Sequence, residues 1–221
     1  MSMITVACGY DERERVGWEV FVSSVRRRTA APVNFLRFGD QADARGTNAF
    51  TLSRFLVPYR MGFQGRAIFF DAVDQICLAD VAELDALFDP DMAVQVVRHP
   101  DYQTRHPRKY VGTNMECLNL DYPRKNWASV MLMNCEHPAW FWAVPSVVDR
   151  VKNPREILDL TWIRDEAIGA LPDCWNRLVD EGQPVEGAKI LHWTAGAPFL
   201  SEAYDDAPGA ELWRAERDAA T

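Results

Sequence analysis

The sequence lacks a paired-cysteine motif and a long hydrophobic run. Its 221 residues include five cysteines, an odd number without a CxxC pair, and four scattered histidines. This pattern predicts reduced, mostly buried thiols in a cytoplasmic protein, and it argues against a structural zinc site. No apolar run approaches the roughly 20 residues that a transmembrane helix requires. We therefore expect no transmembrane segment.

Basic residues are also in short supply. Lys and Arg number 24 against 32 Asp and Glu, which gives a formal net charge of −8. A nucleic-acid partner is not expected, because nucleic-acid-binding proteins normally carry a basic face. Residues 1–9 lack the charged start and long apolar stretch of a signal peptide. Apolar residues make up 48% of the chain, which is enough for a sizeable core, and we expect a single domain over residues 1–221.

Short apolar runs alternate with helical patterns along the chain. Residues 67–70 form the strongest predicted strand, and their wholly apolar character favours a central position in a sheet. Strands that alternate with helices predict an α/β fold with a largely parallel sheet. The predicted strands are residues 4–8, 33–38, 67–70, 92–97, 130–133 and 189–193. The predicted helical segments are residues 11–28, 50–59, 80–88, 140–151 and 165–179, and residues 39–48 are predicted to form a loop.

Polar groups follow several of these strands. Asp71 and Asp74 come directly after the central strand, and His192 lies in the last one. In an open α/β sheet, ligands bind beyond the carboxyl ends of the strands. Two carboxylates and one imidazole suit Mn²⁺ or Mg²⁺, and such an ion would bridge the phosphates of a nucleotide. The alternative is that the aspartates form a turn and the histidine packs in the core.

Seven segments, in order along the chain, resemble bacterial glycosyltransferases of the family 8 type. The resemblance implies a GT-A-like, Rossmann-related fold with a mixed, mostly parallel central sheet flanked by helices. It also implies transfer of a hexose from a nucleoside diphosphate sugar to a saccharide or another hydroxyl acceptor, with a divalent metal and with retention at the anomeric carbon. The similar segments are residues 9–14, 53–59, 65–72, 79–84, 122–129, 168–176 and 192–199.

One departure from the family pattern concerns the metal site. The family has Asp-x-Asp, whereas this chain has Asp71-Ala72-Val73-Asp74, which indicates one inserted residue, most simply Val73. An added residue reverses side-chain direction along a strand, although a bulge or tight turn restores it. We expect a retained site. The alternatives are a degenerate, non-catalytic domain that binds nucleotide sugars, or another nucleotide enzyme such as a nucleotidyltransferase.

The resemblance assigns nucleotide-binding roles to four residues. Tyr10 would stack on the base and Asp11 would hydrogen-bond to it, unless they are a turn tyrosine and a helix cap. Arg54 would face the diphosphate or bind Asp71, unless it is a surface arginine of a helix. Asp71 would contribute to binding both the nucleotide and the metal.

The resemblance also places two acidic residues near the donor sugar. These are Asp165 and Glu166, which we predict to be catalytic. Glu166 would stabilise the positive charge that develops at the anomeric carbon. The alternative is that these two residues begin a helix.

Overall fold

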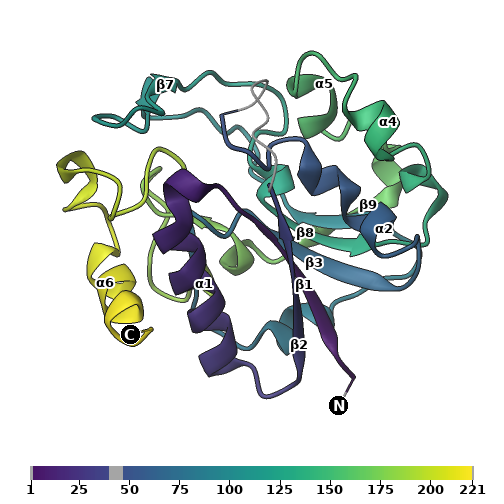
Figure 1. Ribbon diagram of the computed structural model, residues 1–221, viewed down its shortest axis with the longest axis horizontal. Helices are drawn as coiled ribbons and strands as arrows, with labels where there is room; N and C mark the ends of the chain where they lie inside the picture. The colour runs from purple at the N-terminus through teal and green to yellow at the C-terminus, as the bar shows by residue number, and fades with distance from the viewer. Residues whose placement is uncertain (1, 40–46, 221) are drawn as a thin grey trace.

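The protein is built around a six-stranded sheet with the strand order β2-β1-β3-β8-β5-β9 (Figure 1). The computed structural model describes residues 2–39 and 47–220. Neighbouring strands of this sheet are parallel except that β8 runs antiparallel to both β3 and β5. The predicted mixed, mostly parallel sheet with a central β3 is therefore confirmed. The strands are β1 Ile4–Gly9, β2 Val33–Phe38, β3 Arg66–Phe70, β5 Val94–Val97, β8 Val130–Asn134 and β9 Ile168–Leu171.

The alternation of side chains along β3 creates two cores. Ile68 and Phe70 pack on one face with helix α1, Arg15–Arg28. Ala67 and Phe69 point to the other face, because successive side chains of a strand alternate. The core on this second face contains residues of three short helices, so helices cover both faces of the sheet. They are α2 Val57–Arg60, α4 Pro145–Val148 and α5 Arg155–Leu158.

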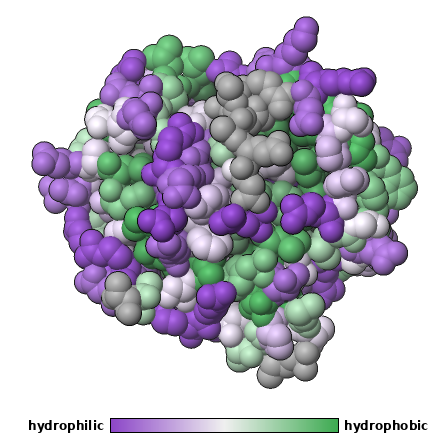
Figure 2. Space-filling view, viewed as in Figure 1, coloured by the Kyte–Doolittle hydropathy of each residue, from purple (hydrophilic) through white to green (hydrophobic). Residues whose placement is uncertain are grey.

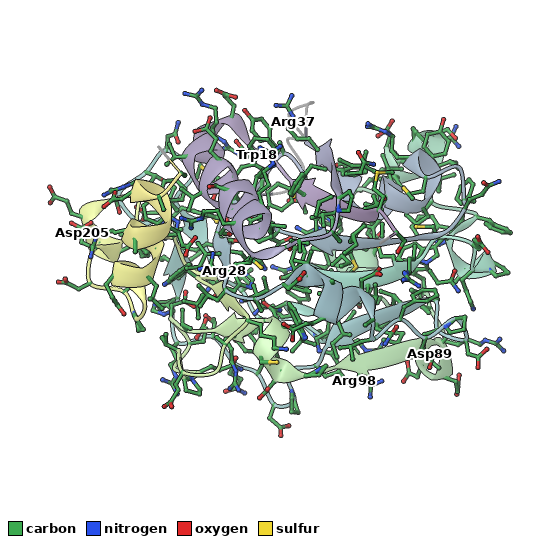
Figure 3. The ribbon with its side chains drawn as sticks, turned by 90° about the horizontal axis from the view of Figure 1, so that it is seen from below. Trp18, Arg28, Arg37, Asp89, Arg98 and Asp205 are labelled. Atoms are coloured by element: carbon green, nitrogen blue, oxygen red, sulfur yellow. The ribbon has the colours of Figure 1, made fainter. Side chains whose placement is uncertain are left out.

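Helix α1 has the apolar face that its sequence predicts. Phe21, Val22 and Val25 are buried against the sheet. At its carboxyl end, Arg27 and Arg28 both bind the buried carboxylate of Glu216. Glu216 belongs to α6, Ala210–Asp218, which lies beside α1 (Figures 1 and 3). The basic last turn of α1 therefore fixes the carboxyl-terminal helix against the domain.

A second sheet joins distant segments next to the end of β3. Its strands have the order β10-β11-β4, and His192 of β11 pairs in register with Gln75 of β4. Because β4 begins one residue after Asp74, this pairing brings the last strand to the end of β3. A separate hairpin joins β6 and β7. The strands are β4 Gln75–Cys77, β6 Arg108–Lys109, β7 Cys117–Leu118, β10 Arg177–Leu178 and β11 Ile190–His192.

Several helices are shorter than the helical segments predicted from the sequence. Helix α3 covers Val81–Asp85, and the Asp80 side chain caps it by accepting from the Ala82 backbone N–H at 2.8 Å. Glu83, in the first turn of this helix, binds Lys189. The other short helices are 3-10 turns: Glu12–Glu14, Ser53–Leu56, Trp127–Ser129, Pro138–Trp140, Asp165–Ala167, Asp173–Trp175 and Glu202–Tyr204.

The helical prediction for residues 165–179 is incomplete. Two 3-10 turns occur there, but the segment also contains the strands β9 and β10. Gly169 lies so close to Gln95 of β5 that a Cβ atom would be 2.7 Å from its side chain. Pairing with β5 therefore outweighs the helical pattern. Residues 40–46 of the predicted loop lie outside the described ranges. Within those ranges, no helix has the length and apolar character needed to cross a membrane.

Candidate active site

A cleft of about 550 Å³ lies where the chain leaves β3. Four residues singled out from the sequence line it: Arg54, Asp71, Asp74 and His192. In Figure 1 the β6–β7 hairpin and α5 lie above the central sheet. Residues of that hairpin and of α5 form further parts of the cleft wall. The site therefore lies at the edge of the sheet where an α/β fold places its ligands.

A tight turn keeps Asp71 and Asp74 on the same side. Ala72 adopts a left-handed conformation with φ of 66°, and the Val73 backbone N–H donates to the Asp71 carbonyl at 2.8 Å. The Ala72 backbone N–H in turn donates to the Gln75 side chain at 3.1 Å. A left-handed non-glycine residue costs about 1–2 kcal/mol, which the surrounding packing must offset. The additional residue in the Asp-x-Asp pattern is thus absorbed by a turn, and both aspartates reach the cleft.

Gly17 of α1 makes room for this turn. A Cβ atom at position 17 would lie 1.9 Å from the Val73 carbonyl oxygen. Alanine within a helix normally stabilises a protein by about 0.5–1 kcal/mol relative to glycine. We expect Gly17→Ala to destabilise this one by about 1–3 kcal/mol and to displace the turn. Urea unfolding and Mn²⁺ titration check this expectation, with Glu19→Ala on the exposed side of α1 as the control. An equally stable Gly17→Ala variant with unchanged Mn²⁺ binding would contradict it.

Asp71, Asp74 and His192 form one buried cluster. Each offers a ligand atom, and these atoms lie within 4.8 Å of one another. His192 Nε2 is 3.5 Å from Asp74 Oδ2. Burial opposes a charge on His192, yet Asp74 and Asp71 hold the pKa of the imidazole above its ordinary value. The prediction that these three side chains meet in space is confirmed.

The surroundings of His192 leave one ring nitrogen available. Its Nδ1 donates to the Asn176 side-chain oxygen at 2.8 Å. This bond places a proton on Nδ1, so Nε2, which faces Asp74, is the ring nitrogen that can bind a metal ion once it is deprotonated. Asn176 is fully buried and also donates to the Asn126 carbonyl at 3.2 Å. Sequence reasoning assigned Asn176 no role, because its proximity to His192 depends on the parallel pairing of β10 with β11.

Arg54 is buried at the side of the cluster. Its guanidinium pairs with Asp71 Oδ1 at 2.6 Å and donates to the carbonyls of Thr51 and Ala128. Burial raises the pKa of Asp71 to about 6, against the opposing charge of Arg54. The interpretation as a surface arginine is therefore wrong. Of the two remaining interpretations, the pairing with Asp71 is observed, and Arg54 also lines the cleft.

The donor set fits a divalent cation. Asp74 Oδ1 is buried and has no hydrogen-bond partner among the described residues. An unpaired buried carboxylate oxygen is costly, and a metal ion is one group that satisfies it. Carboxylate oxygens with a single imidazole suit Mn²⁺ and Mg²⁺. Asp71, Asp74 and His192 could therefore hold such an ion.

Tyr10 and Asp11 are not among the residues that line the cleft. The Tyr10 hydroxyl donates to Glu12, and its ring meets Trp18 edge-on with 5.6 Å between the centroids. The Asp11 carboxylate binds Arg13 and accepts from the Ala49 backbone N–H at 2.9 Å. Asp11 also caps the following 3-10 turn. The predicted contacts of Tyr10 and Asp11 with a base remain predictions.

Asp165 and Glu166 are also absent from the cleft lining. They begin the 3-10 helix Asp165–Ala167. The Asp165 side chain is 75% exposed and pairs with Arg124 at 2.7 Å. The structure therefore does not bring these residues together with the cluster of Asp71, Asp74 and His192, and their catalytic role remains a prediction.

Cations line the cleft in a chain that is acidic as a whole. They are Arg13, Arg54, Lys109, Lys125 and Arg155, against the two acidic residues Asp71 and Asp74. Lys125 is buried, and its ammonium group donates to the Asn119 side chain at 2.7 Å. Sequence reasoning missed all but Arg54. They lie on separate segments, and no local pattern connects them.

A buried polar network supports one wall of the cleft. The Asn48 side chain donates to Glu14 and lies 3.1 Å from the Tyr110 hydroxyl. Burial raises the pKa of Glu14 to about 8, and the charge of Asp74 acts in the same direction. Arg13 binds the Thr47 carbonyl at 3.1 Å. With the Asp11–Ala49 bond, residues 11–14 thus hold residues 47–49 in place.

The sequence has a clear relative in Arabidopsis thaliana. Protein CDI is 33% identical over 227 residues, which cover 95% of this chain and 84% of the relative. The chain belongs to the CDI family. No model of a protein family matches it.

Solved structures show which fold this member of the CDI family has. The galactosyltransferase LgtC, in complex with donor and acceptor sugar analogues, matches with a TM-score of 0.61 and 11% identity, over 98% of this chain and 96% of LgtC. The glycosyltransferase GlyE of Streptococcus pneumoniae matches with a TM-score of 0.62 and 14% identity. That match covers 98% of this chain and 60% of GlyE, so the chain spans about three fifths of GlyE's length. The GT-A fold expected from the sequence is confirmed.

Proposed function

We propose that this protein is a metal-dependent glycosyltransferase that uses a nucleoside diphosphate sugar. The observation that carries the proposal is the convergence of Asp71, Asp74 and His192 in a cleft at the carboxyl end of β3. The acceptor is a saccharide or another molecule with a hydroxyl group. A hexose donor and retention at the anomeric carbon rest on the sequence resemblance to family 8 enzymes, whereas LgtC and GlyE support the GT-A fold.

The cluster would hold Mn²⁺ or Mg²⁺. Asp71, Asp74 and the Nε2 atom of His192 are the protein ligands, and Asn176 orients the imidazole. The bound ion would supply positive charge to the diphosphate as it leaves the sugar. Arg54 keeps Asp71 in position through their 2.6 Å ion pair.

The cations of the cleft favour a diphosphate ligand. Lys109, Lys125 and Arg155 line the same cleft as the metal cluster, and the chain as a whole has a net charge of −8. A cationic cleft in an acidic protein concentrates anionic ligands there and not elsewhere on the surface. A cleft of about 550 Å³ lies within the range of small-molecule sites.

The remaining site residues have proposed roles that follow the family resemblance. Tyr10 and Asp11 would contact the base from the side of the cleft. Asp165 and Glu166 would act near the donor sugar, which requires them to reach toward the cleft when the donor is bound. Arg124 holds Asp165 at 2.7 Å, and this pair would have to open.

Deletion of Val73 tests whether the turn is an adapted part of the site. We expect the deletion to abolish Mn²⁺-dependent nucleoside diphosphate binding, because Val73 provides the N–H that closes the turn and its carbonyl packs on Gly17. Calorimetric titration of UDP and GDP with Mn²⁺ measures the effect, and circular dichroism checks that the variant is folded. Binding by the deletion and not by the parent would favour a degenerate domain.

A thermal-shift screen tests the proposed ligand class. Nucleoside diphosphates, their sugars and nucleoside triphosphates are compared with and without Mn²⁺. A ligand at a hundredfold excess over its dissociation constant stabilises the folded protein by about 2.7 kcal/mol. We expect stabilisation by at least one nucleotide only when Mn²⁺ is present. Stabilisation by nucleoside triphosphates alone would favour a nucleotidyltransferase.

A further inference from the structure

Two exposed leucines lie at the end of the β6–β7 hairpin, Leu118 in β7 and Leu120 just after it. Leu118 is 60% exposed and Leu120 is 50% exposed. Figure 1 shows the hairpin projecting above the sheet, and Figure 2 shows apolar residues gathered at the upper edge of the same view. Exposed apolar side chains that lie together are often part of a functional surface.

Contacts of Asn119 hold this segment in place while Leu118 and Leu120 remain exposed. Asn119, between them, is buried. Its side chain donates to Thr104 Oγ1 at 2.9 Å and accepts from Lys125 at 2.7 Å. Because side chains alternate along an extended segment, the buried Asn119 leaves the two leucines on either side of it exposed. Their exposure is therefore a consequence of the fold and not of a loose loop end.

Both leucines line the same cleft as the metal cluster. Met115 and Leu158 also line it, so aliphatic side chains stand among the polar residues of this wall. Aliphatic side chains offer no hydrogen bonds to the hydroxyl groups of a free sugar. They do favour a hydrocarbon group, whose burial removes apolar surface from water.

We propose that the acceptor is an amphiphilic molecule, with its reactive hydroxyl group attached to or near an aliphatic chain that packs on Leu118 and Leu120. This inference rests on the proposed function, because it assigns the acceptor of the same cleft. The cationic and metal-binding residues take the donor diphosphate, and the hairpin takes the apolar part of the acceptor.

The test compares two probes, octyl glucoside below its micelle concentration and methyl glucoside. Each is titrated into the parent protein with and without Mn²⁺ and UDP or GDP. We expect octyl glucoside to bind at least tenfold more tightly than methyl glucoside. The double variant Leu118→Ser with Leu120→Ser should lose this preference, while Leu87→Ser, an exposed leucine outside the cleft, should keep it.

The outcomes separate this inference from the proposed function. Equal binding of the two glucosides by the parent, a preference that survives in the double variant, or a preference lost equally in Leu87→Ser overturns the apolar acceptor site. All variants should bind Mn²⁺ and nucleoside diphosphate as the parent does. Absence of that nucleotide binding counts against the glycosyltransferase, whereas the octyl preference measured without nucleotide still reports on the hairpin.

Discussion

Replacing Asp74 with asparagine is expected to weaken Mn²⁺-dependent nucleoside diphosphate binding about a hundredfold or more. The substitution removes a charged ligand from the cluster with Asp71 and His192. Changes in groups that only orient metal ligands already cost about 10–100-fold in metal affinity. Calorimetric titration of Mn²⁺ with UDP and with GDP measures the effect.

The same substitution should not lower the free energy of unfolding of the metal-free protein. Among the described residues, Asp74 Oδ1 is buried without a hydrogen-bond partner, and the Asp74 carboxylate lies near that of Asp71. Asp74→Asn should therefore leave the free energy of unfolding unchanged or raise it in metal-free buffer. Asp91→Asn, an exposed aspartate, serves as the control for both measurements. Unchanged nucleotide affinity in Asp74→Asn would mean that Asp74 only forms the turn.

The second large effect concerns Glu14 and pH. Burial raises the pKa of Glu14 from 4.5 to about 8, so the folded protein keeps this proton while the unfolded chain releases it. Stability from this group is fully present below pH 4.5 and is lost as pH rises to about 8. The loss corresponds to as much as roughly 5 kcal/mol. We expect Glu14→Gln to match the parent at pH 4.5 and to be more stable by several kcal/mol at pH 8.5.

Urea unfolding in metal-free buffer at the two pH values measures this difference. Glutamine keeps an acceptor for the Asn48 amide and has no charge to lose. Glu19→Gln, on the exposed side of α1, controls for a general change in net charge. If the parent and Glu14→Gln lose stability equally between pH 4.5 and pH 8.5, Glu14 is ionised in the folded protein.

Local patterns predicted the elements that carry the site. The apolar run of residues 67–70 predicted the central strand β3, and the apolar face of residues 15–28 predicted helix α1. The strand at residues 189–193 was also predicted, and with Asp71 and Asp74 it indicated a group of two carboxylates and one imidazole, which the structure brings together. These features depend on hydrophobic periodicity and on the rule that ligands bind beyond the carboxyl ends of the strands in an open α/β sheet.

Features set by contacts between distant segments were not predictable. β9 forms because Gly169 allows close pairing with β5, and nothing near Gly169 in the sequence shows that partner. The Asn176–His192 bond and the Asn48–Glu14 bond each join residues that meet only in the folded chain. The turn at Ala72 likewise depends on the room that Gly17 leaves on another element.

The most direct test of the account is donor turnover. The parent protein is incubated with UDP-, GDP-, ADP-, CDP- and dTDP-hexoses, with Mn²⁺ or with EDTA. The acceptor is octyl glucoside, methyl glucoside or water. Mass spectrometry follows release of the nucleoside diphosphate. The account predicts release from at least one donor with Mn²⁺, none with EDTA, and loss of that release in Asp71→Asn and His192→Ala. Release that is unaffected by EDTA and by both substitutions, or no release from any donor, would contradict it.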